Sequence, residues 1–461
     1  MKPAVTIFIF LIFFSCAKDG FITSPDASLS TSTDTLAFDT VFTNAGSITQ
    51  SFKVFNTNNQ KLKISSIRLA GGPSSPFKIN VDGVASPQIT NIEINKNDSI
   101  YVFVQVNVDP TSSTLPFILR DSIQINYNGN NKWVQLQAYG QNAIFYKNKI
   151  IDKNTVWINT LPYVISGSIK VDTGKTLQIE AGTKIYLHAD APFLVDGTLI
   201  VRGTKNEPVI FAGDRLDADY KDLPAGWPGI YFGNTSENNL LVHSIIKNAY
   251  QGLVVQSITA TPDPKLQISR SIIHNIYDAG IIAINSNIQA DNCLVFNCGK
   301  NISLQYGGHY RFVNCTVASF GNLYISHMDP VLSIYNYLPE TTGSPTSPLN
   351  AVFQNCIFWG EGGSVDNEIV LNKQGSSSFE ATFDHCLYKA KDEIPNATFI
   401  SSIKNEAPMF DSINISKNIY DFHFNNHPNS SAVDAGVASP FLYDLDDKKR
   451  DAKPDIGCYE Q

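Results

Sequence analysis

Six short stretches between residues 242 and 388 share one pattern, and this pattern decides the fold. They read VHSII (242–246), SRSII (269–273), DNCLV (291–295), VNCTV (313–317), QNCIF (354–358) and DHCLY (384–388). Each has a polar residue, then Ser or Cys, then apolar residues, and two of the intervals equal 22 residues. A period of roughly 20–30 residues built from short runs is typical of a solenoid protein.

The runs within each repeat indicate strands rather than helices. They are short, rich in Ile, Val, Phe and Tyr, and bounded by Gly and Asn, as is typical of strands. A helical solenoid would need apolar residues at i, i+3, i+4 and i+7, and the repeats lack this spacing. Strands that recur once per coil stack in parallel, about 4.8 Å apart. We therefore predict an all-β chain with a right-handed parallel β-helix over residues 144–430.

The Ser or Cys position of the repeat predicts a stack of small side chains inside the solenoid. This position is held in turn by Ser244, Ser271, Cys293, Cys315, Cys356 and Cys386. We expect the thiols to be buried and to behave as small apolar groups. Neighbouring coils would also hold them near bonding distance, so a strained disulfide is the alternative.

The first coils carry a family resemblance. They contain GKTLQIEAGTKIYL (174–187), FLVDGTLIVRGTKNEPVIFAG (193–213) and GWPGIYFG (226–233). These short apolar strands, separated by Gly-Thr, Asp-Gly and Asn-Glu-Pro turns, closely resemble the opening coils of bacterial pectate-lyase-like β-helix proteins. The resemblance covers about residues 165–390 and implies the fold. Proteins with this fold differ in activity, so it does not imply one function.

The C-terminal stretch carries a second resemblance. SAVDAG (431–436) and DLDDKKRDAKPDIGCYE (444–460) are similar to the closing segment of many secreted β-helix proteins. Asp447 stands where that segment usually has Gly, and Cys458 stands where it usually has Ala. The resemblance implies that residues 431–461 close the open end of the solenoid, where unpaired strand edges would otherwise be exposed.

The N-terminus has the features of a targeting segment. Lys2 supplies a positive charge, residues 4–14 are apolar apart from Thr6, and Ser15-Cys16 follows at once. An apolar run of this length is too short to cross a bilayer in the mature protein. Ser15-Cys16 resembles the lipobox of bacterial lipoproteins, which implies a signal peptide over residues 1–15 and lipidation of Cys16. A plain secretory signal is the alternative.

Lys18-Asp19 resembles the surface-export signal of lipoproteins in the Bacteroidetes. Together with the lipobox, it implies a lipid-anchored protein of the outer membrane that is exposed at the cell surface. Its contact with the membrane would be the N-terminal lipid. Residues 16–33 are rich in Ser, Thr and Asp, and we expect them to form a flexible tether.

Residues 34–143 predict an immunoglobulin-like β-sandwich. In SIYVFVQVNVDP (99–110), apolar residues occupy every second position from Ile100 to Val108. This strict period of two is typical of a half-buried antiparallel strand. About seven such strands over this length predict the sandwich. It resembles the immunoglobulin-like modules that precede β-helix domains in Bacteroidetes lipoproteins, which implies a spacer.

Composition excludes one class of partner. Charged residues make up only 16% of the chain, and the net charge is −8. A nucleic-acid-binding surface needs a basic patch, and Lys and Arg form no extended cluster in the sequence. We therefore expect no nucleic-acid partner.

One loop, GDRLDADYKDLPAGW (213–227), concentrates charge. Its four carboxylates are Asp214, Asp217, Asp219 and Asp222. Like charges this close favour neutralisation by a cation, and Asp residues at alternating loop positions suit Ca²⁺. Ca²⁺ is therefore the one cofactor that we predict. Local pairing of these carboxylates with Arg215 and Lys221 is the alternative.

The resemblance also bears on catalysis. Polysaccharide lyases on this fold use Ca²⁺ and a basic side chain to remove the proton next to a sugar carboxylate, which makes Arg215 and Lys221 candidate catalytic residues. Glycoside hydrolases need paired carboxylates, and no Asp pair recurs in register with the repeat. We assign four isolated carboxylates to turns or solvated faces: Asp278, Asp291, Asp366 and Glu368.

An excursion over residues 329–350 leaves the solenoid. Its Tyr335 and Tyr337 either offer their rings to a sugar or are buried in a strand. Our leading hypothesis is a non-catalytic surface protein that binds a polysaccharide or mediates adhesion. The first alternative is a Ca²⁺-dependent polysaccharide lyase or glycoside hydrolase, and the second is a structural component of a surface assembly.

Overall fold

Strands make up most of the regular structure of the computed structural model, which describes residues 20–43, 47–110, 116–259, 263–339, 341, 343 and 345–461. The helical segments in these ranges are two single 3-10 turns, Gly72–Ser74 and Ile415–Lys417. None of the described helices is therefore long and apolar enough to cross a membrane. The predicted all-β class is confirmed. The chain forms two compact units, residues 1–142 and 143–461.

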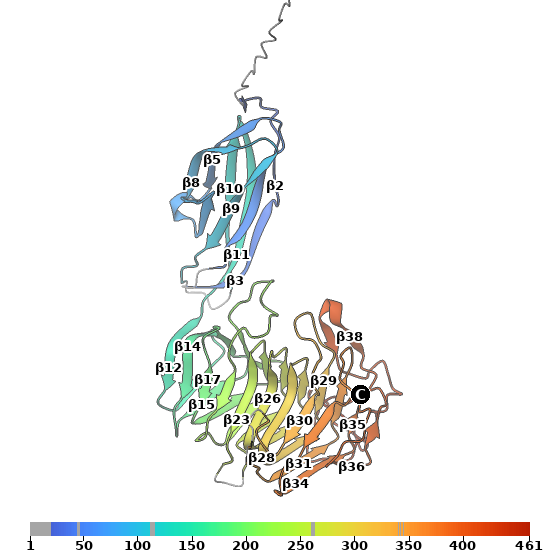
Figure 1. The fold of residues 1–461 in the computed structure, drawn as a ribbon. Helices are drawn as coiled ribbons and strands as arrows, with labels where there is room; N and C mark the ends of the chain where they lie inside the picture. Colours follow the sequence, from blue (N-terminus) through green and yellow to red (C-terminus); the bar gives the residue numbers. More distant parts are fainter. Residues whose placement is uncertain are drawn as a thin grey trace, which may run out of the picture. The chain divides into compact units, whose positions relative to one another are not determined.

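The first unit contains two sheets that share one hydrophobic core (Figure 1). One sheet has the order β1 (Phe21–Ile22), β5 (Lys61–Leu69), β10 (Phe117–Tyr127), β11 (Asn130–Gln141) and β3 (Thr35–Phe42), with β8 (Gln88–Ile94) also paired to β5. The other has the order β2 (Leu29–Thr31), β4 (Gln50–Asn56), β9 (Asp98–Val106), β6 (Phe77–Val81) and β7 (Val84–Ala85). Neighbouring strands are antiparallel except in the pairs β1 with β5 and β3 with β11.

Alternation along β9 shows how this core forms. Val102, Val104 and Val106 are fully buried, whereas Tyr101 and Phe103, which alternate with them, are exposed. Successive side chains of a strand point to opposite faces, so a period of two places one complete row in the core. The alternation predicted for this strand is confirmed.

The predicted flexible tether over residues 16–33 is wrong where the structure describes it. Residues 20–33 contain β1 and β2, which pair with β5 and β4. The side-chain amide of Asn128 also donates hydrogen bonds to the carbonyl oxygens of Ile22 (2.9 Å) and Ser24 (3.0 Å). The polar composition of this stretch did not indicate strands, because their partners lie much later in the chain.

The second unit is a parallel sheet of 26 strands wound into a solenoid (Figure 1). Most strands pair with the strands two or three places away in the chain order. The chain therefore passes along three faces before it returns one strand spacing, about 4.8 Å, further on. The large parallel sheet predicted from the repeats is confirmed. We call the three faces columns 1, 2 and 3.

Column 1 contains β17 (Phe193–Val195), β20 (Ile230–Phe232), β23 (Gln251–Gln256), β30 (Leu332–Tyr335) and β33 (Ile369–Asn372). Column 2 contains β13 (Thr155–Trp157), β15 (Thr176–Glu180), β18 (Thr198–Arg202), β21 (Asn239–Val242), β24 (Leu266–Ser269), β31 (Leu349–Gln354), β34 (Phe379–Asp384) and β36 (Thr398–Ile400). Column 3 contains β16 (Lys184–Leu187), β19 (Val209–Gly213), β22 (Ser244–Lys247), β25 (Ile272–His274), β27 (Leu294–Phe296), β29 (Thr316–Ser319), β32 (Ile357–Gly360), β35 (Leu387–Tyr388) and β37 (Ile403–Lys404). Four longer strands serve two columns: β12 (Ile144–Ile151) and β14 (Tyr163–Val171) join columns 3 and 1, and β26 (Ala279–Asp291) and β28 (Lys300–Val313) join columns 1 and 2.

The repeated motif marks the corner between columns 2 and 3. The residue before each Ser or Cys has a positive φ of 44–53°. These residues are His243, Arg270, Asn292, Asn314, Asn355 and His385. Left-handed backbone turns the chain sharply, and Asn adopts this conformation more readily than most residues. The polar residue of the motif is therefore the corner itself.

The Ser or Cys that follows each corner points into the solenoid, as predicted. Cys293, Cys315, Cys356 and Cys386 all belong to the main hydrophobic core. They and the other described cysteines are free thiols. Burial raises the pKa of the Cys293, Cys315 and Cys356 thiols well above the ordinary value, so these groups are neutral.

The C-terminal stretch does not lie where we predicted. Parallel pairing ends at β37, before the expected boundary at residue 430, and an antiparallel hairpin of β38 (Ser412–Asn414) and β39 (Ile419–Asp421) follows. The segment beyond this hairpin packs alongside column 3 instead of closing the end of the solenoid. The outward side of column 3 carries apolar residues, and the segment buries them in a second core. This core includes Leu294, Ile357, Leu387, Phe422, Ile456 and Tyr459.

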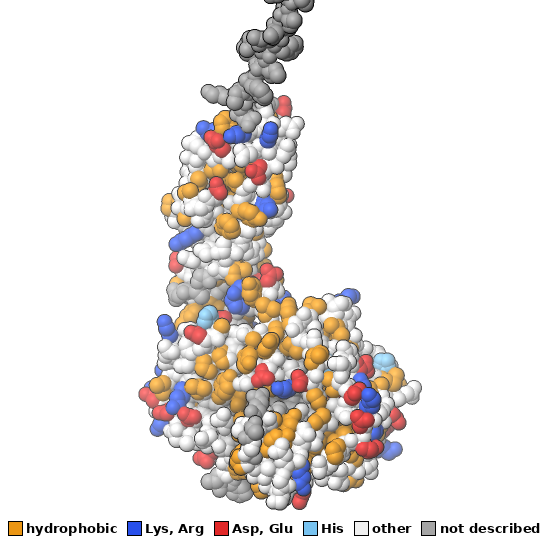
Figure 2. Space-filling view, viewed as in Figure 1, with side chains coloured by type: hydrophobic (Ala, Val, Ile, Leu, Met, Phe, Trp, Pro, Cys, Tyr) orange, Lys and Arg blue, Asp and Glu red, His pale blue; other side chains and the backbone are white. Residues whose placement is uncertain are grey.

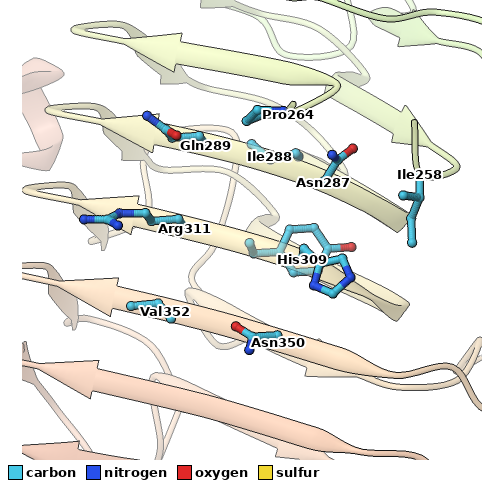
Figure 3. Close-up of a pocket in the computed structure, with 10 residues that line it drawn as sticks. Ile258, Pro264, Asn287, Ile288, Gln289, His309, Arg311, Asn350 and Val352 are labelled. Carbon is cyan, nitrogen blue, oxygen red and sulfur yellow. The ribbon is translucent and has the colours of Figure 1, made fainter. Parts of the chain in front are cut away.

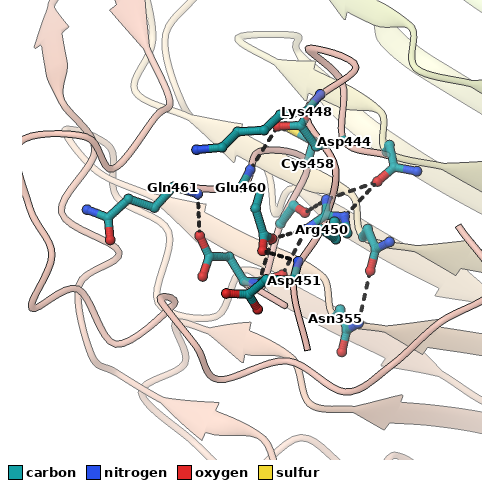
Figure 4. A network of polar contacts seen from close by, with 12 residues as sticks. Asn355, Asp444, Lys448, Arg450, Asp451, Cys458, Glu460 and Gln461 are labelled. Atoms are coloured by element: carbon teal, nitrogen blue, oxygen red, sulfur yellow. Dashed lines mark hydrogen bonds and ion pairs between the residues drawn. The ribbon is translucent and has the colours of Figure 1, made fainter. Parts of the chain in front are cut away.

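A buried polar network joins this segment to the coils (Figure 4). Arg450 Nη1 lies 3.1 Å from the carboxylate of Glu460, and its Nη2 donates to Asn292 Oδ1 at 2.9 Å. The carboxylate of Asp444 accepts backbone hydrogen bonds from Lys448 (2.7 Å) and Glu460 (2.9 Å). Asn292 is a corner residue, so the network links two parts of the chain that are 158 residues apart.

Candidate functional site

A cleft of about 410 Å³ lies over column 1. Its floor is a row of outward side chains on successive strands. Tyr231 is in register with Val254, which is in register with Ile282 and then Ser303. Val254 and Ile282 are buried with Ala279 in a small apolar cluster separate from the main core. Because each step along the row is about 4.8 Å, the floor suits a ligand that lies across the strands.

Polar side chains flank this apolar floor. Gln251 Nε2 donates to Asp278 Oδ2 at 2.8 Å, and Lys300 lies beside them on the next strand of the column. On the other flank, Gln305 Nε2 donates to Ser303 Oγ at 2.9 Å. The excursion after β30 completes the lining with Leu338, Pro339 and Thr341. An apolar surface with a few convergent polar groups is the usual composition of a ligand site.

Two exposed tyrosines adjoin the cleft. Tyr250 and Tyr277 are 46% and 55% exposed, and they stack with ring centroids 5.6 Å apart at an interplanar angle of 24°. Each immediately precedes a residue of the lining, Gln251 or Asp278. The backbone N–H of Asp278 donates to the carbonyl oxygen of Tyr250 at 2.8 Å, which keeps successive coils in register. The pair presents an aromatic platform to solvent.

The described lining of the cleft contains few ionisable groups. Burial raises the pKa of Tyr231, and the nearby Tyr250 and Asp278 add to this effect. The neutral phenol of Tyr231 donates to the carbonyl oxygen of Pro228 at 3.1 Å. Asp278 is the only carboxylate among the described residues that line the cleft. Glycoside hydrolysis uses a pair of carboxylates, and the described lining supplies one.

A second depression, the column 2 groove, lies on a different face of the coils (Figure 3). Its volume is about 540 Å³. The residues that line it are Ile258, Pro264, Asn287, Ile288, Gln289, His309, Tyr310, Arg311, Asn350 and Val352. Amide, imidazole and guanidinium groups provide its polar surface, and the described lining contains no carboxylate.

The predicted calcium loop does not gather its four carboxylates. Asp214 lies 2.8 Å from His188 Nδ1, and Asp217 is held by Arg215 Nε at 2.8 Å. Burial raises the pKa of Asp214, although the contact with His188 opposes the shift. The other two carboxylates are exposed or half-buried: Asp219 and Asp222. No group of three or more His, Cys, Asp or Glu side chains that could hold a metal occurs in the described ranges. The Ca²⁺ site stays a prediction that this arrangement does not support.

The two candidate catalytic residues of this loop have local contacts. The guanidinium of Arg215 lies 3.8 Å from the ring centroid of Tyr220, and its pairing with Asp217 raises the Arg215 pKa. A cation stabilised in this way is a poor proton acceptor. The side chain of Lys221 is exposed. Neither Arg215 nor Lys221 lines the cleft or the groove.

The remaining predicted residues lie outside the cleft. Tyr335 and Tyr337 are half-buried and meet edge to face, with ring centroids 5.6 Å apart at 85°. They are not part of the lining, although Leu338, which follows them, is. Cys16, the predicted lipidation site, lies outside the described residues.

Two carboxylates that we assigned to solvated faces are in fact buried. Glu368 Oε1 lies 2.9 Å from Nε2 of His327, and both side chains are enclosed. Asp291 accepts a hydrogen bond from Ser269 Oγ at 2.8 Å. The polar stretch around Glu368 contains no local signal for burial, because its partner lies 41 residues earlier. Only the stacking of coils brings the two together.

No protein-family model and no curated protein matches this chain. Among solved structures, the catalytic domain of a GH87 alpha-1,3-glucanase in complex with tetrasaccharides is 10% identical, with 77% of this chain and 87% of that chain covered and a TM-score of 0.23. A family 123 glycoside hydrolase from Clostridium perfringens is 12% identical, with 25% of this chain and only 26% of that chain covered and a TM-score of 0.18. The PapD-like domain of human CEP192 is 9% identical, with 30% of this chain and 97% of that chain covered and a TM-score of 0.18.

Proposed function

We propose that the second unit is a right-handed parallel β-helix that binds a glycan in the column 1 cleft without cleaving it. In this proposal the first unit is an immunoglobulin-like spacer, and a lipid on Cys16 anchors the protein at the surface of the outer membrane. One observation carries the binding proposal. It is the exposed Tyr250–Tyr277 stack beside a cleft with an apolar floor and polar flanks.

Sugar rings have chemistry that matches this cleft. Their C–H faces are apolar and pack on aromatic rings, and their hydroxyls pair with amides and carboxylates. Gln251, Asp278 and Lys300 supply such polar groups along one flank. Because the coils repeat about every 4.8 Å, a polymer that lies across the strands meets a new row of side chains at each coil.

Calorimetric titration of the full chain with a panel of neutral and acidic polysaccharides tests the proposal. We expect at least one glycan to bind, and we expect Tyr277→Ala to weaken its binding about tenfold, because half of the aromatic platform is removed. Tyr277→Phe keeps the ring and should keep the affinity. Tyr443→Ala is the matched control, since Tyr443 is 49% exposed but lies in the C-terminal segment.

The same incubations distinguish the other candidate functions. New unsaturated sugar ends that disappear with a chelator would show a Ca²⁺-dependent lyase, and new reducing ends without unsaturation would show a hydrolase. Either product would replace the non-catalytic proposal. If no glycan bound, the structural role in a surface assembly would take its place. Release of the Cys16→Ser variant from membranes tests the anchor separately.

A further inference from the structure

The column 2 groove presents two basic side chains from one strand (Figure 3). His309 and Arg311 lie two residues apart on β28 and both are exposed. Alternate residues of a strand face the same side and are separated by roughly 6.7 Å. Both side chains therefore border the same groove. This face is distinct from column 1, which holds the proposed glycan cleft.

These basic groups have no partner in the part of the chain that the structure describes. Among the described residues, neither Arg311 nor His309 has a side-chain hydrogen bond or an ion pair. Three of the four other arginines of the second unit each contact a carboxylate: Arg215, Arg270 and Arg450. The nearest acidic side chain along the register of His309 is Glu380, two strands further on, where the Asn350 amide donates to it at 3.2 Å. The charge of Arg311 is thus available to a ligand.

The rest of the lining suits a glycan chain. Gln289 is in register with Arg311, and Asn287 and Asn350 flank His309 on the neighbouring strands. The amides of Gln289 and Asn350 donate and accept hydrogen bonds, as sugar hydroxyls require. The Asn287 amide already donates to Thr259 Oγ1 and to the carbonyl oxygen of Asp263. Ile258, Pro264 and Val352 add apolar surface. The lining spans three strands of column 2, roughly 10 Å at the usual strand spacing.

We infer that the column 2 groove binds an anionic substituent of a glycan, either a sulfate ester or a carboxylate. The planar guanidinium of Arg311 pairs with two oxygens of the anion, as arginine does with other oxyanions. Gln289 and Asn350 hold neighbouring hydroxyls. The protein as a whole carries a net charge of −8, so local positive charge that has no ion-pair partner favours the binding of an acidic polysaccharide.

Calorimetric titration of the full-length protein with a sulfated galactan, a polyuronate and a neutral glucan tests this inference. We expect one of the two acidic polymers to bind, more weakly as salt rises from 50 to 300 mM. Arg311→Gln should lower its affinity about tenfold, because a charge-assisted pair is lost. The affinity of Arg311→Lys should lie between those of the unaltered protein and Arg311→Gln, since lysine keeps the charge and loses the bidentate geometry. The polymer that responds identifies sulfate or carboxylate as the ligand.

Lys184→Gln is the matched control, because Lys184 is an exposed residue of β16 and its loss changes the net charge equally. Equal weakening by Lys184→Gln and Arg311→Gln would overturn the inference in favour of diffuse electrostatic attraction. Failure of both acidic polymers to bind would also overturn it. Tyr277→Ala separates the two sites: if it abolished binding of the acidic polymer and Arg311→Gln had no effect, the column 1 proposal would stand and this inference would fall.

Discussion

Single residues with left-handed backbone set the corners of the solenoid. Asn314 is an example, with a φ of 53° and a fully buried side chain. Its Oδ1 accepts a hydrogen bond from Asn355 Nδ2 at 2.9 Å, and its Nδ2 donates to Ser439 Oγ at 3.2 Å. The residue therefore combines a backbone role with a link between a neighbouring corner and the C-terminal segment.

Substitution separates these two roles of Asn314. Asn314→Gly keeps the positive φ and loses the side-chain bonds, so we expect a loss of about 1–2 kcal/mol in the free energy of unfolding. Asn314→Val adds a β-branched side chain at positive φ, and we expect a loss of roughly 3 kcal/mol or more. Urea unfolding of both variants measures the difference. Equal losses would show that backbone conformation is not the constraint at this corner.

At the scale of elements, the cysteines of the repeat form a stack of buried thiols beside column 3. Successive strands of this column are in register. The Ser or Cys that precedes each strand therefore stacks on the Ser or Cys of the previous coil, and both point into the core. Burial raises the pKa of Cys298 and of Cys458 to about 12 as well. Since the thiolate is the reactive form, these groups are protected both by their pKa and by enclosure.

We therefore expect the chain from residue 20 onward, which lacks Cys16, to resist alkylation at pH 8 in the folded state. All six remaining cysteines should react within the same time once the protein is unfolded in denaturant without reductant. Mass spectrometry of the alkylated protein gives the count. A rapid reaction of the folded protein would contradict burial. Fewer than six modified cysteines after unfolding would show a disulfide between neighbouring coils.

At the scale of the whole molecule, the C-terminal segment fastens several coils together. Besides the Arg450 link to Asn292, the Asp447 carboxylate contacts Arg270 at 2.5 Å and His243 at 3.3 Å. Asn355 Nδ2 donates to the carbonyl oxygen of Val437 at 2.7 Å. All four coil partners are corner residues. One segment therefore ties successive corners into a single unit.

Removal of the Arg450 charge tests this role. Arg450→Met leaves the buried Glu460 carboxylate without its cation, and we expect a loss of roughly 3 kcal/mol in unfolding free energy. The double variant Arg450→Met with Glu460→Gln should recover part of the loss, because the side chain at position 460 that faced the cation is then neutral. Thermal unfolding of the two variants and the unaltered protein measures both effects. A double variant that is less stable than Arg450→Met would show that Glu460 acts through its other hydrogen bonds.

Patterns between near neighbours are sufficient to predict much of this molecule. The period of two along β9 indicates which valines face the core, since adjacent side chains of a strand must diverge. The interval between motifs such as DNCLV and VNCTV predicts parallel stacking and the inward position of the cysteines. The left-handed corners are also marked in the sequence, by an Asn, His or Arg immediately before the Ser or Cys.

The sequence by itself thus determined the all-β class, the large parallel sheet and the thiol stack, because each follows from local periodicity. Only the tertiary structure decided where function could reside. The Tyr250–Tyr277 platform, the setting of Arg311 in the column 2 groove and the buried His327–Glu368 pair all depend on which residues the coils place side by side. The C-terminal segment likewise lies along column 3 because an apolar row there needs covering. Such neighbours are set by strand register and packing across long chain separations, which no local pattern encodes.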